Sequence, residues 1–373
     1  MNKREDSAKS KISRRRILQG CLTAAAVGTV SAMDPALAYS AITDGVRAVD
    51  IHAHFYPQSY LDVIAKEGKP FGIEYRNTAK GLVIQSRLGT AGPVPSNIVD
   101  LKERIASMDA RGVAVHALSL TYPMAYWGDA DLSSALCKAW NDAASAAHKA
   151  YPTRLFGFLT LPMLYPGRAL DELNRASRLP GMRGVYLGTH IDGHDLDHPM
   201  FQPVFARIEE LGLPIFLHPI ETVGGKRMEP FYLTNLLGNP FDTAIAACHL
   251  IFGGVLDRHP KLQIGLAHGG GALPILIGRI DRGWNVRPEL RALHLPQSPS
   301  DYLQRFTYDT IVHSKSVMQF VIQEVGIERV MLGSDYCFDM GYNRPVQFVD
   351  QLELSRAQRR MILGGTAAKL LKL

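Results

Sequence analysis

The chain has 373 residues, of which 46% are hydrophobic and 20% are charged, a composition typical of a soluble globular protein. The formal net charge is +6, but seven of the 41 basic and three of the 35 acidic residues lie within the first 38 positions. The remaining 34 basic and 32 acidic residues nearly balance, so the charge gives no argument for nucleic-acid binding. A chain of this length suits one large α/β barrel or two ordinary domains.

Residues 1–38 have the features of a cleaved export signal. Residues 13–19 (SRRRILQ) resemble a twin-arginine signature, a weakly apolar run extends over 20–33, and residues 36–38 (ALA) form a cleavage site. The apolar run is too short to span a membrane stably. We therefore expect a periplasmic or otherwise exported protein whose mature domain covers residues 39–373, with no membrane span after signal cleavage.

Short β-branched or apolar runs then alternate with longer segments of helical periodicity. Strands are expected at residues 46–51, 113–120, 155–161, 184–187, 214–217, 262–267, 306–309 and 330–333. Helices are expected at residues 97–111, 131–150, 167–178, 200–211, 240–258, 272–284, 315–325 and 355–370. Eight strands that alternate with eight helices predict an α/β fold, a (β/α)₈ TIM barrel over residues 39–373, and an open doubly wound sheet is the alternative.

Residues 56–95 interrupt this alternation. They are rich in glycine and proline and contain short alternating pieces such as residues 81–88. We expect them to form a small β insertion after strand one, over the barrel mouth. Long loops at 188–199 and 219–240 follow strands four and five, on the side of a barrel where such loops build active sites.

Histidines and an aspartate follow several of the predicted strands. His52 and His54, in the sequence DIHAH, are two residues apart and so project from the same face of strand one. His218, His268 and Asp335 directly follow strands five, six and eight. An isolated H-x-H pair is weak evidence for a metal, but barrel geometry brings all five side chains to one axial cavity, where imidazoles suit a divalent ion.

These residues and the stretches around them resemble the amidohydrolase superfamily, in particular its aminocarboxymuconate-semialdehyde decarboxylase-like branch. The similarity covers nearly the whole mature chain. It includes the stretches at 104–113, 218–228, 268–281 and 332–336. The fold that this resemblance implies is the same barrel that the periodicity predicts.

The resemblance also implies roles for individual residues. The metal ligands would be His52, His54, His218 and Asp335, holding one divalent ion, zinc in most relatives and manganese in some. His268 would act beside the metal as a general acid or base, together with Asp335. Many superfamily members hold a second metal with a modified lysine near strand four, but residues 182–188 (MRGVYLG) end without a lysine, which favours one ion per chain.

The resemblance further implies a homodimer, in which Arg279 of one chain reaches the substrate carboxylate bound by the other. Planar bidentate pairing with a carboxylate suits arginine, although a surface salt bridge on a helix is an equal alternative. The family's decarboxylase has a second carboxylate-binding arginine where this chain has Gly92. Arg87 lies nearby as a candidate replacement, and the departure favours a substrate with a single carboxylate or a phenolic acid.

Three functions fit these observations. The first is a metal-dependent non-oxidative decarboxylase of a small unsaturated or aromatic carboxylic acid. The second is a metal-dependent hydrolase of a lactone, amide or ester, which would use the same activated hydroxide. The third, a non-catalytic partner subunit, is disfavoured because every ligand is intact.

Other polar and aromatic residues are not assigned a direct role in the site. His116 lies within a strand and is interpreted as a packed core residue, and the loop with His190, His194 and His198 as a solvated loop. Asp309 and His313 follow strand seven and are candidates for contacts behind the ligands. Aromatic residues after strand two could wall a pocket or simply pack; they are Tyr122, Tyr126 and Trp127.

Overall fold

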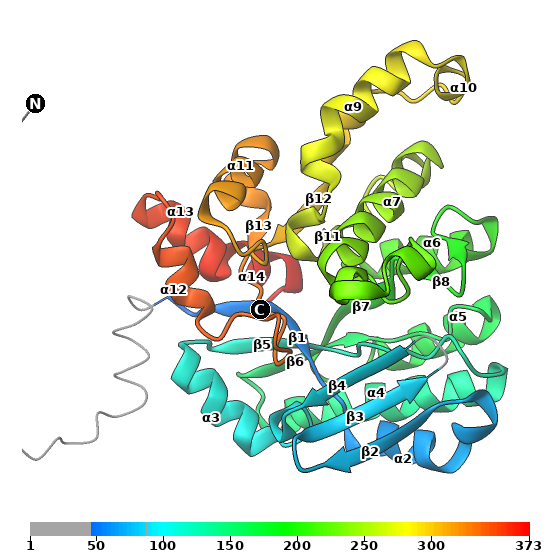
Figure 1. The fold of residues 1–373 in the computed structure, drawn as a ribbon, viewed down its shortest axis with the longest axis vertical. Helices are drawn as coiled ribbons and strands as arrows, with labels where there is room; N and C mark the ends of the chain where they lie inside the picture. Colours follow the sequence, from blue (N-terminus) through cyan, green and yellow to red (C-terminus); the bar gives the residue numbers. More distant parts are fainter. Residues whose placement is uncertain (1–45, 87–88) are drawn as a thin grey trace, which may run out of the picture. The chain divides into compact units, whose positions relative to one another are not determined.

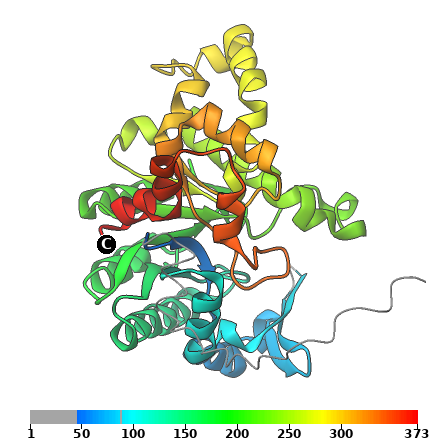
Figure 2. The same cartoon turned by 90° about the vertical axis from the view of Figure 1, so that its left-hand side faces the viewer.

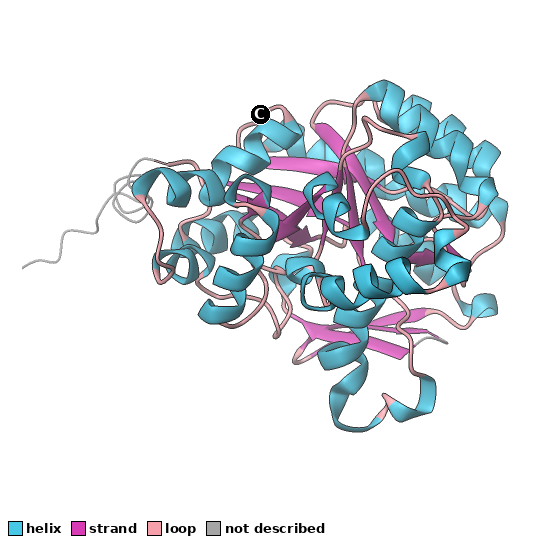
Figure 3. Cartoon of the chain, turned by 90° about the horizontal axis from the view of Figure 1, so that it is seen from above, coloured by secondary structure: helices cyan, strands magenta, loops and turns pink. Residues whose placement is uncertain are grey.

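The computed structural model describes residues 46–86 and 89–373, and its centre is an eight-stranded parallel sheet in the order β1-β5-β6-β7-β10-β11-β12-β13. The expected signal segment at residues 1–38 lies outside the described residues. Helices follow the strands and surround them, as Figure 1 and Figure 3 show, so the predicted TIM barrel is confirmed. The strands are β1 Val49–His54, β5 Val115–Ser119, β6 Leu155–Leu159, β7 Met182–Gly188, β10 Ile215–His218, β11 Ile264–Leu266, β12 Phe306–Asp309 and β13 Val330–Met331.

The first and last strands meet and close the sheet. The backbone N–H of Ile51 donates to the carbonyl of Leu332 at 2.9 Å, and Ala53 forms a parallel bridge with Tyr336. Because this seam joins the two edges, the open doubly wound alternative is wrong. The seam also brings the segment after β13 directly against β1, which matters for the site described below.

The helices that surround the barrel follow the expected order, with some divided in two. The expected helix over residues 240–258 is split by Gly253 and Gly254, and α9 continues into a short α10 that projects from the barrel in Figure 1. The helices are α3 Leu101–Arg111, α4 Ala130–Ala150, α5 Pro166–Ala176, α6 Gln202–Leu211, α7 Asn239–Phe252, α8 Val255–Arg258, α9 Leu273–Val286, α10 Pro288–Arg291, α11 Lys315–Val325 and α12 Pro345–Asp350. Within the described ranges, no helix is both long enough and apolar enough to cross a lipid bilayer.

Helix ends follow local side-chain chemistry. The carboxylate of Asp100 accepts the N–H of Glu103 and caps α3, and the helix therefore begins after the short 3₁₀ turn η2 (Ser96–Ile98), four residues later than the expected residue 97. Gly112 and Gly212 end α3 and α6 in the left-handed conformation.

The barrel strands are buried on both faces, as parallel strands covered by helices should be. Large aromatic side chains fill the interior: the rings of Tyr186 and Phe216 stack with centroids 6.0 Å apart, and Phe158 packs against both. The barrel is therefore a packed core rather than a channel. The polar side chains of the site lie instead at the carboxyl ends of the strands.

Residues 56–95 contain the expected β insertion and also a helix that was not predicted. Three antiparallel strands form a separate sheet, β2 (Glu74–Thr78), β3 (Gly81–Ser86) and β4 (Gly89–Val94), and α2 (Gln58–Glu67) precedes it. The sheet is tied to the loop after β5 by the Tyr122 hydroxyl, which donates to the carbonyl of Gly89 at 3.0 Å.

The last expected helix, over residues 355–370, is interrupted. It forms α13 (Arg356–Arg360), a π-helical turn η10 (Met361–Gly365) and α14 (Thr366–Leu371). A Cβ at Gly364 would lie 2.1 Å from the carbonyl of Arg47, so the glycine lets this turn approach the start of β1 closely. Figure 2 shows the red C-terminal helices beside the blue first strand.

Candidate metal centre

His52 and His54 lie on β1 and turn into the barrel. Both are fully buried, and their Nε2 atoms are 3.1 Å apart. The observed strand spans Val49–His54, three residues further along than predicted, so both histidines lie within a strand rather than after one. Their backbone is therefore held between β5 on one side and Tyr336, in the segment after β13, on the other.

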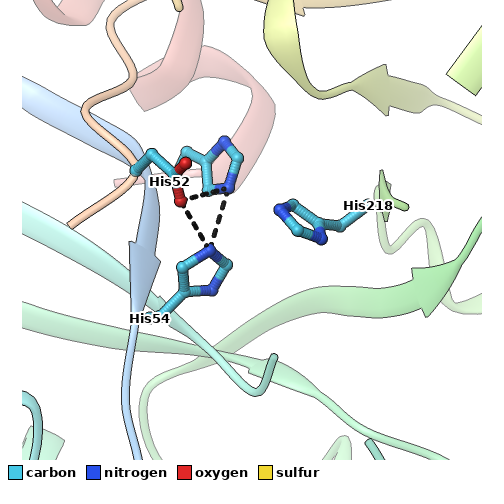
Figure 4. A group of neighbouring side chains, drawn as sticks. His52, His54 and His218 are labelled. Atoms are coloured by element: carbon cyan, nitrogen blue, oxygen red, sulfur yellow. Dashed lines mark hydrogen bonds and ion pairs between the residues drawn. The ribbon is translucent and has the colours of Figure 1, made fainter. Parts of the chain in front are cut away.

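His218 and Asp335 complete a four-residue cluster. His218 is the last residue of β10, and Asp335 lies in the loop after β13 with φ of 56°, a conformation that is uncommon for a residue with a side chain. Asp335 Oδ1 lies 2.9 Å from His54 Nε2 and 3.5 Å from His52 Nε2. One donor atom from each of the four residues lies within 4.8 Å of the others, and Figure 4 shows the three imidazoles around a common space.

This donor set fits a single divalent cation. Tetrahedral ligands that each lie about 2.1 Å from a metal are separated by about 3.4 Å. The separations among the His52, His54 and Asp335 donor atoms, 2.9–3.5 Å, are close to this value. His52 Nδ1 lies 2.7 Å from Asp309 Oδ2 and His54 Nδ1 lies 3.2 Å from Ser119 Oγ. When each Nδ1–H donates to its partner, the Nε2 lone pairs face the centre, as metal ligation requires.

The electrostatic environment favours neutral imidazoles opposite an ionised carboxylate. Burial lowers the pKa of His54 to about 4 and lowers the pKa of His218 well below its usual value. Burial opposes ionisation of Asp335, but the surrounding histidines outweigh it and hold the pKa of this carboxyl well below its ordinary range. His52 differs: burial favours its neutral form, yet Asp335 and Asp309 together raise its pKa above the usual value.

His268 lies beside the cluster without being one of its four members. Its Nε2 is 3.8 Å from Asp335 Oδ2, and its ring centroid is 5.2 Å from that of His218. Its Nδ1 is buried, and no partner for it is found among the described residues. The next residue must be small, because a Cβ at Gly269 would lie 2.4 Å from Val312 Cγ1. The imidazole is therefore held next to the ligands with one nitrogen facing Asp335.

A cavity of about 300 Å³ opens onto this centre. Its lining includes His268, Asp335, Asn235, Asn239 and His313. The rest of the described lining is uncharged, and neither lysine nor arginine occurs in it; these residues are Leu236, Pro240, Gly271, Ile311, Val312, Val317 and Met340. The cavity can enclose a small, partly apolar molecule next to the metal ligands.

The arrangement of strand-end ligands corresponds to a known family. The amidohydrolase family model matches residues 49–373, which is almost all of the described chain. The chain belongs to the amidohydrolase family. The resemblance noted from the sequence is thus confirmed.

Several relatives of this amidohydrolase are decarboxylases. It is 33% identical over 330 residues to the 2-amino-3-carboxymuconate-6-semialdehyde decarboxylase of Dictyostelium discoideum, an alignment that covers 87% of this chain and 91% of the relative. Among solved structures, it is similar to Metarhizium anisopliae IDCase in apo form, with a TM-score of 0.80, 27% identity and coverage of 88% and 98%.

A second solved structure contains a metal and a small acid. It is the 5-carboxyvanillate decarboxylase of Novosphingobium aromaticivorans complexed with manganese and 4-hydroxy-3-methoxy-5-nitrobenzoic acid. The TM-score is 0.76, the identity 25%, and the match covers 88% of this chain and 97% of that one.

Other residues singled out in the sequence lie in different places in this amidohydrolase. Arg279 is exposed on α9 and does not line the cavity described above. Gly92 lies in β4 with φ of 97°, and Arg87 lies outside the described residues. His313 lines the cavity, and Asp309 accepts from His52 and from the backbone N–H of Gly269.

The sequence interpretation missed several polar residues that surround the ligands. Ser119, Asp50 and Arg104 contact the ligands or their backbone, and Asn235 and Asn239 line the cavity. Asp50 could have been found, because it precedes His52 by two residues and therefore shares its face of the strand. Arg104 lies on a predicted surface helix, and the sequence gives no sign that its side chain is fully buried.

Proposed function

We propose that this amidohydrolase is a metal-dependent non-oxidative decarboxylase of a small aromatic or unsaturated carboxylic acid. The observation that carries the proposal is the convergence of His52, His54, His218 and Asp335 beside His268 at a small, partly apolar cavity. The decarboxylases described above support it, because they match most of this chain.

The reaction breaks the bond between a carbon and its carboxylate, and CO₂ leaves without the bonding electrons. A divalent cation held by the four ligands would polarise a neighbouring substrate oxygen and so stabilise the negative charge that develops. The electron pair stays on the substrate carbon, which takes a proton in place of CO₂. His268 is placed to donate this proton, with its Nε2 oriented by Asp335, and it regains a proton from water.

The cavity favours a substrate with one carboxylate and an apolar body. Its apolar side chains, among them Ile311, Val317 and Met340, can pack against a ring and exclude water from it. Because its described lining contains no lysine or arginine, a second carboxylate would have no cationic partner from the same chain. Amide groups of Asn235 and Asn239 can instead bind a hydroxyl or methoxy oxygen.

Carbon dioxide release is the direct test of this function. The purified mature protein, loaded with zinc or manganese, is incubated with phenolic and muconic acids while CO₂ is measured. We expect release from at least one acid and its loss in His268→Asn, with metal content staying near one per chain. If lactones or esters open and no acid loses CO₂, the protein is a hydrolase. Metal loss in His268→Asn would instead make His268 a ligand.

We propose zinc as the native metal, with manganese as the second candidate. Three imidazole nitrogens and one carboxylate oxygen are ligand types that zinc binds in proteins, while the manganese-containing 5-carboxyvanillate decarboxylase supports the alternative. Elemental analysis of protein purified from its natural source, without added metal, distinguishes the two.

We also propose that the protein acts as a homodimer. Large apolar side chains are exposed on neighbouring elements, the segment before α7 and the helices α7 and α9; they are Phe231, Leu237, Phe241 and Ile275. Ile275 and Arg279 are four residues apart and share the exposed face of α9, so a partner that covers this face would meet Arg279. Light scattering measures the mass of the assembly and so tests the dimer. If Arg279 binds the substrate carboxylate in the partner's site, Arg279→Gln should raise KM more than it lowers kcat.

Residues 1–38 are proposed to direct export through the twin-arginine route. The arginine pair at Arg14 and Arg15, within residues 13–19, and the small residues at 36–38 support this proposal. Amino-terminal sequencing of the exported protein should begin at Tyr39. Substitution of both arginines by lysine should leave the full-length precursor in the cytoplasm.

A further inference from the structure

A buried carboxylate connects the two chain segments that carry most of the metal ligands. Asp50 Oδ1 accepts the backbone N–H of His52 at 3.0 Å and the backbone N–H of Ser334 at 3.0 Å. Its other oxygen, Oδ2, accepts the hydroxyl of Ser334. Since Ser334 immediately precedes Asp335, one fully buried side chain fixes the first ligand relative to the last.

A buried arginine holds the same strand at its other end. Arg104 extends from α3, is fully buried, and donates through Nη2 to the backbone carbonyl of His54 at 2.5 Å. Its guanidinium also lies over the ring of Tyr336, the residue after Asp335, with 4.6 Å to the ring centroid. Arg104 thus contacts the backbone of one ligand and the neighbour of another.

His116 lies between these two charged groups. Arg104 Nη1 donates to His116 Nδ1 at 3.2 Å, so the ring proton is on Nε2, which lies 3.6 Å from Asp50 Oδ2. Burial lowers the pKa of His116 well below its usual value, and this imidazole is therefore neutral. The arginine and the carboxylate form a charge-balanced unit across it, as buried charges require.

We infer that Asp50 and Arg104 are positioning residues that set the affinity and geometry of metal binding by fixing the backbone of His52, His54 and Asp335. Neither touches the space between the four donor atoms, so their influence passes through the ligand-bearing segments. Groups that orient ligands in this way typically change metal affinity by about 10–100-fold when they are removed. The inference rests on the metal centre but not on which reaction the centre performs.

The substitution Asp50→Asn tests the carboxylate with almost no change in volume. An amide can keep the oxygen that accepts the two backbone N–H groups, but its NH₂ cannot accept the Ser334 hydroxyl, so that contact must reverse its direction. The substitution also removes the negative charge that balances Arg104. We expect the dissociation constant for Zn²⁺, measured by competition with a chelator in the absence of substrate, to rise about 10–100-fold. The visible spectrum of the Co²⁺-loaded variant should also change, because it reports the coordination geometry.

Glu172→Gln is the matched control. Glu172 is a buried carboxylate on α5 that bonds Asn141 at 2.7 Å and Arg175 at 2.8 Å, and it contacts none of the ligand-bearing segments. The substitution Glu172→Gln should lower the unfolding temperature while leaving the Zn²⁺ dissociation constant and the Co²⁺ spectrum unchanged. If Asp50→Asn behaves in the same way, the positioning role is wrong and Asp50 serves only the stability of the fold.

Two further variants keep the inference testable if Asp50→Asn does not fold. Ser334→Ala removes only the hydroxyl contact to Asp50 and should weaken Zn²⁺ binding by a smaller factor. Arg104→Met removes the contacts to His54 and His116 and should weaken Zn²⁺ binding. Arg104→Lys should keep only part of the native affinity, because lysine lacks the planar guanidinium that reaches both partners. Unchanged Zn²⁺ affinity in both Ser334→Ala and Arg104→Met overturns the inference, whether or not any acid is decarboxylated.

Discussion

The barrel has a cavity at each end, and the larger of the two is not the one that contains the metal-ligand cluster. The cavity at the carboxyl ends of the strands has about 300 Å³ and opens onto the His52, His54, His218 and Asp335 cluster. The cavity at the amino ends has about 890 Å³ and is bordered by the starts of the strands and by the C-terminal helices. The smaller cavity carries the convergent donors, so the site is identified by chemistry and not by volume.

The charges at the two ends differ as well. Six cationic side chains line the amino-end cavity, with Glu328 as the acidic side chain among the described lining; the cations are Arg47, Arg305, Arg329, Arg360, Lys369 and Lys372. Several of them donate to backbone carbonyls, such as Arg305 to Pro260 and Lys372 to Gly212. In a barrel the carboxyl end usually carries function and the amino end stability, and this division predicts which substitutions affect activity.

Asp335→Asn should have the largest effect. It removes the one anionic ligand and the carboxylate beside His268, so both metal binding and proton transfer fail. We expect turnover to fall by at least about 10³-fold together with loss of bound metal. Elemental analysis and CO₂ release measure the two effects. A variant that keeps one metal per chain and full activity would contradict the assignment of the carboxyl end as the active one.

Metal affinity should depend on pH through His52. Its pKa is raised above the usual value of about 6.5, whereas those of His54 and His218 are lowered, so below that pH His52 carries a proton that a cation must displace. Affinity should therefore rise as pH increases through the pKa of His52, by about tenfold per pH unit below it, and become constant above it. Calorimetry in buffers of different ionisation enthalpy should find about one proton released per metal below about pH 6, and fewer as the pH rises.

A smaller effect is expected at Asn239, which lines the carboxyl-end cavity. Loss of one neutral hydrogen bond to substrate in Asn239→Ala should raise KM by about 3–10-fold, with metal content unchanged. Steady-state kinetics measure this change. An unchanged KM for every accepted acid would mean that the amide does not contact substrate.

Arg360→Ala at the amino end should have the smallest effect. The side chain is exposed and far from the ligands along the barrel, so kcat/KM should stay within about twofold of the native value. This variant serves as the control for the comparison between the two ends. A loss of activity like that of Asp335→Asn would show that the amino end takes part in the reaction.

The sequence was sufficient to predict the barrel and the residues that meet at its open end. His52 and His54 were predicted because residues two apart share a face of a strand, and His218, His268 and Asp335 because each follows an apolar strand. These inferences depend on short local patterns, which a single sequence displays directly.

Features that depend on long-range packing could not be predicted. The burial of Arg104 depends on Phe55 and Tyr336, which lie far from it in the sequence. The π-helical turn at Met361–Gly365 arises where Gly364 approaches Arg47, and the helix within residues 56–95 was hidden by the glycines and prolines around it. The start of β1 was placed too early because Val46 and Ala48 are as apolar as the strand itself.

The seam between β1 and β13 has a consequence for folding. His54 and Asp335 are 281 positions apart in the chain, so a cation bound by both closes a loop of nearly the whole domain. Contacts of such sequence separation form late and slowly, since chain entropy opposes them until most of the barrel has assembled. The bound ion would therefore act as a removable cross-link: chelation should speed unfolding and should open this seam before the rest of the sheet.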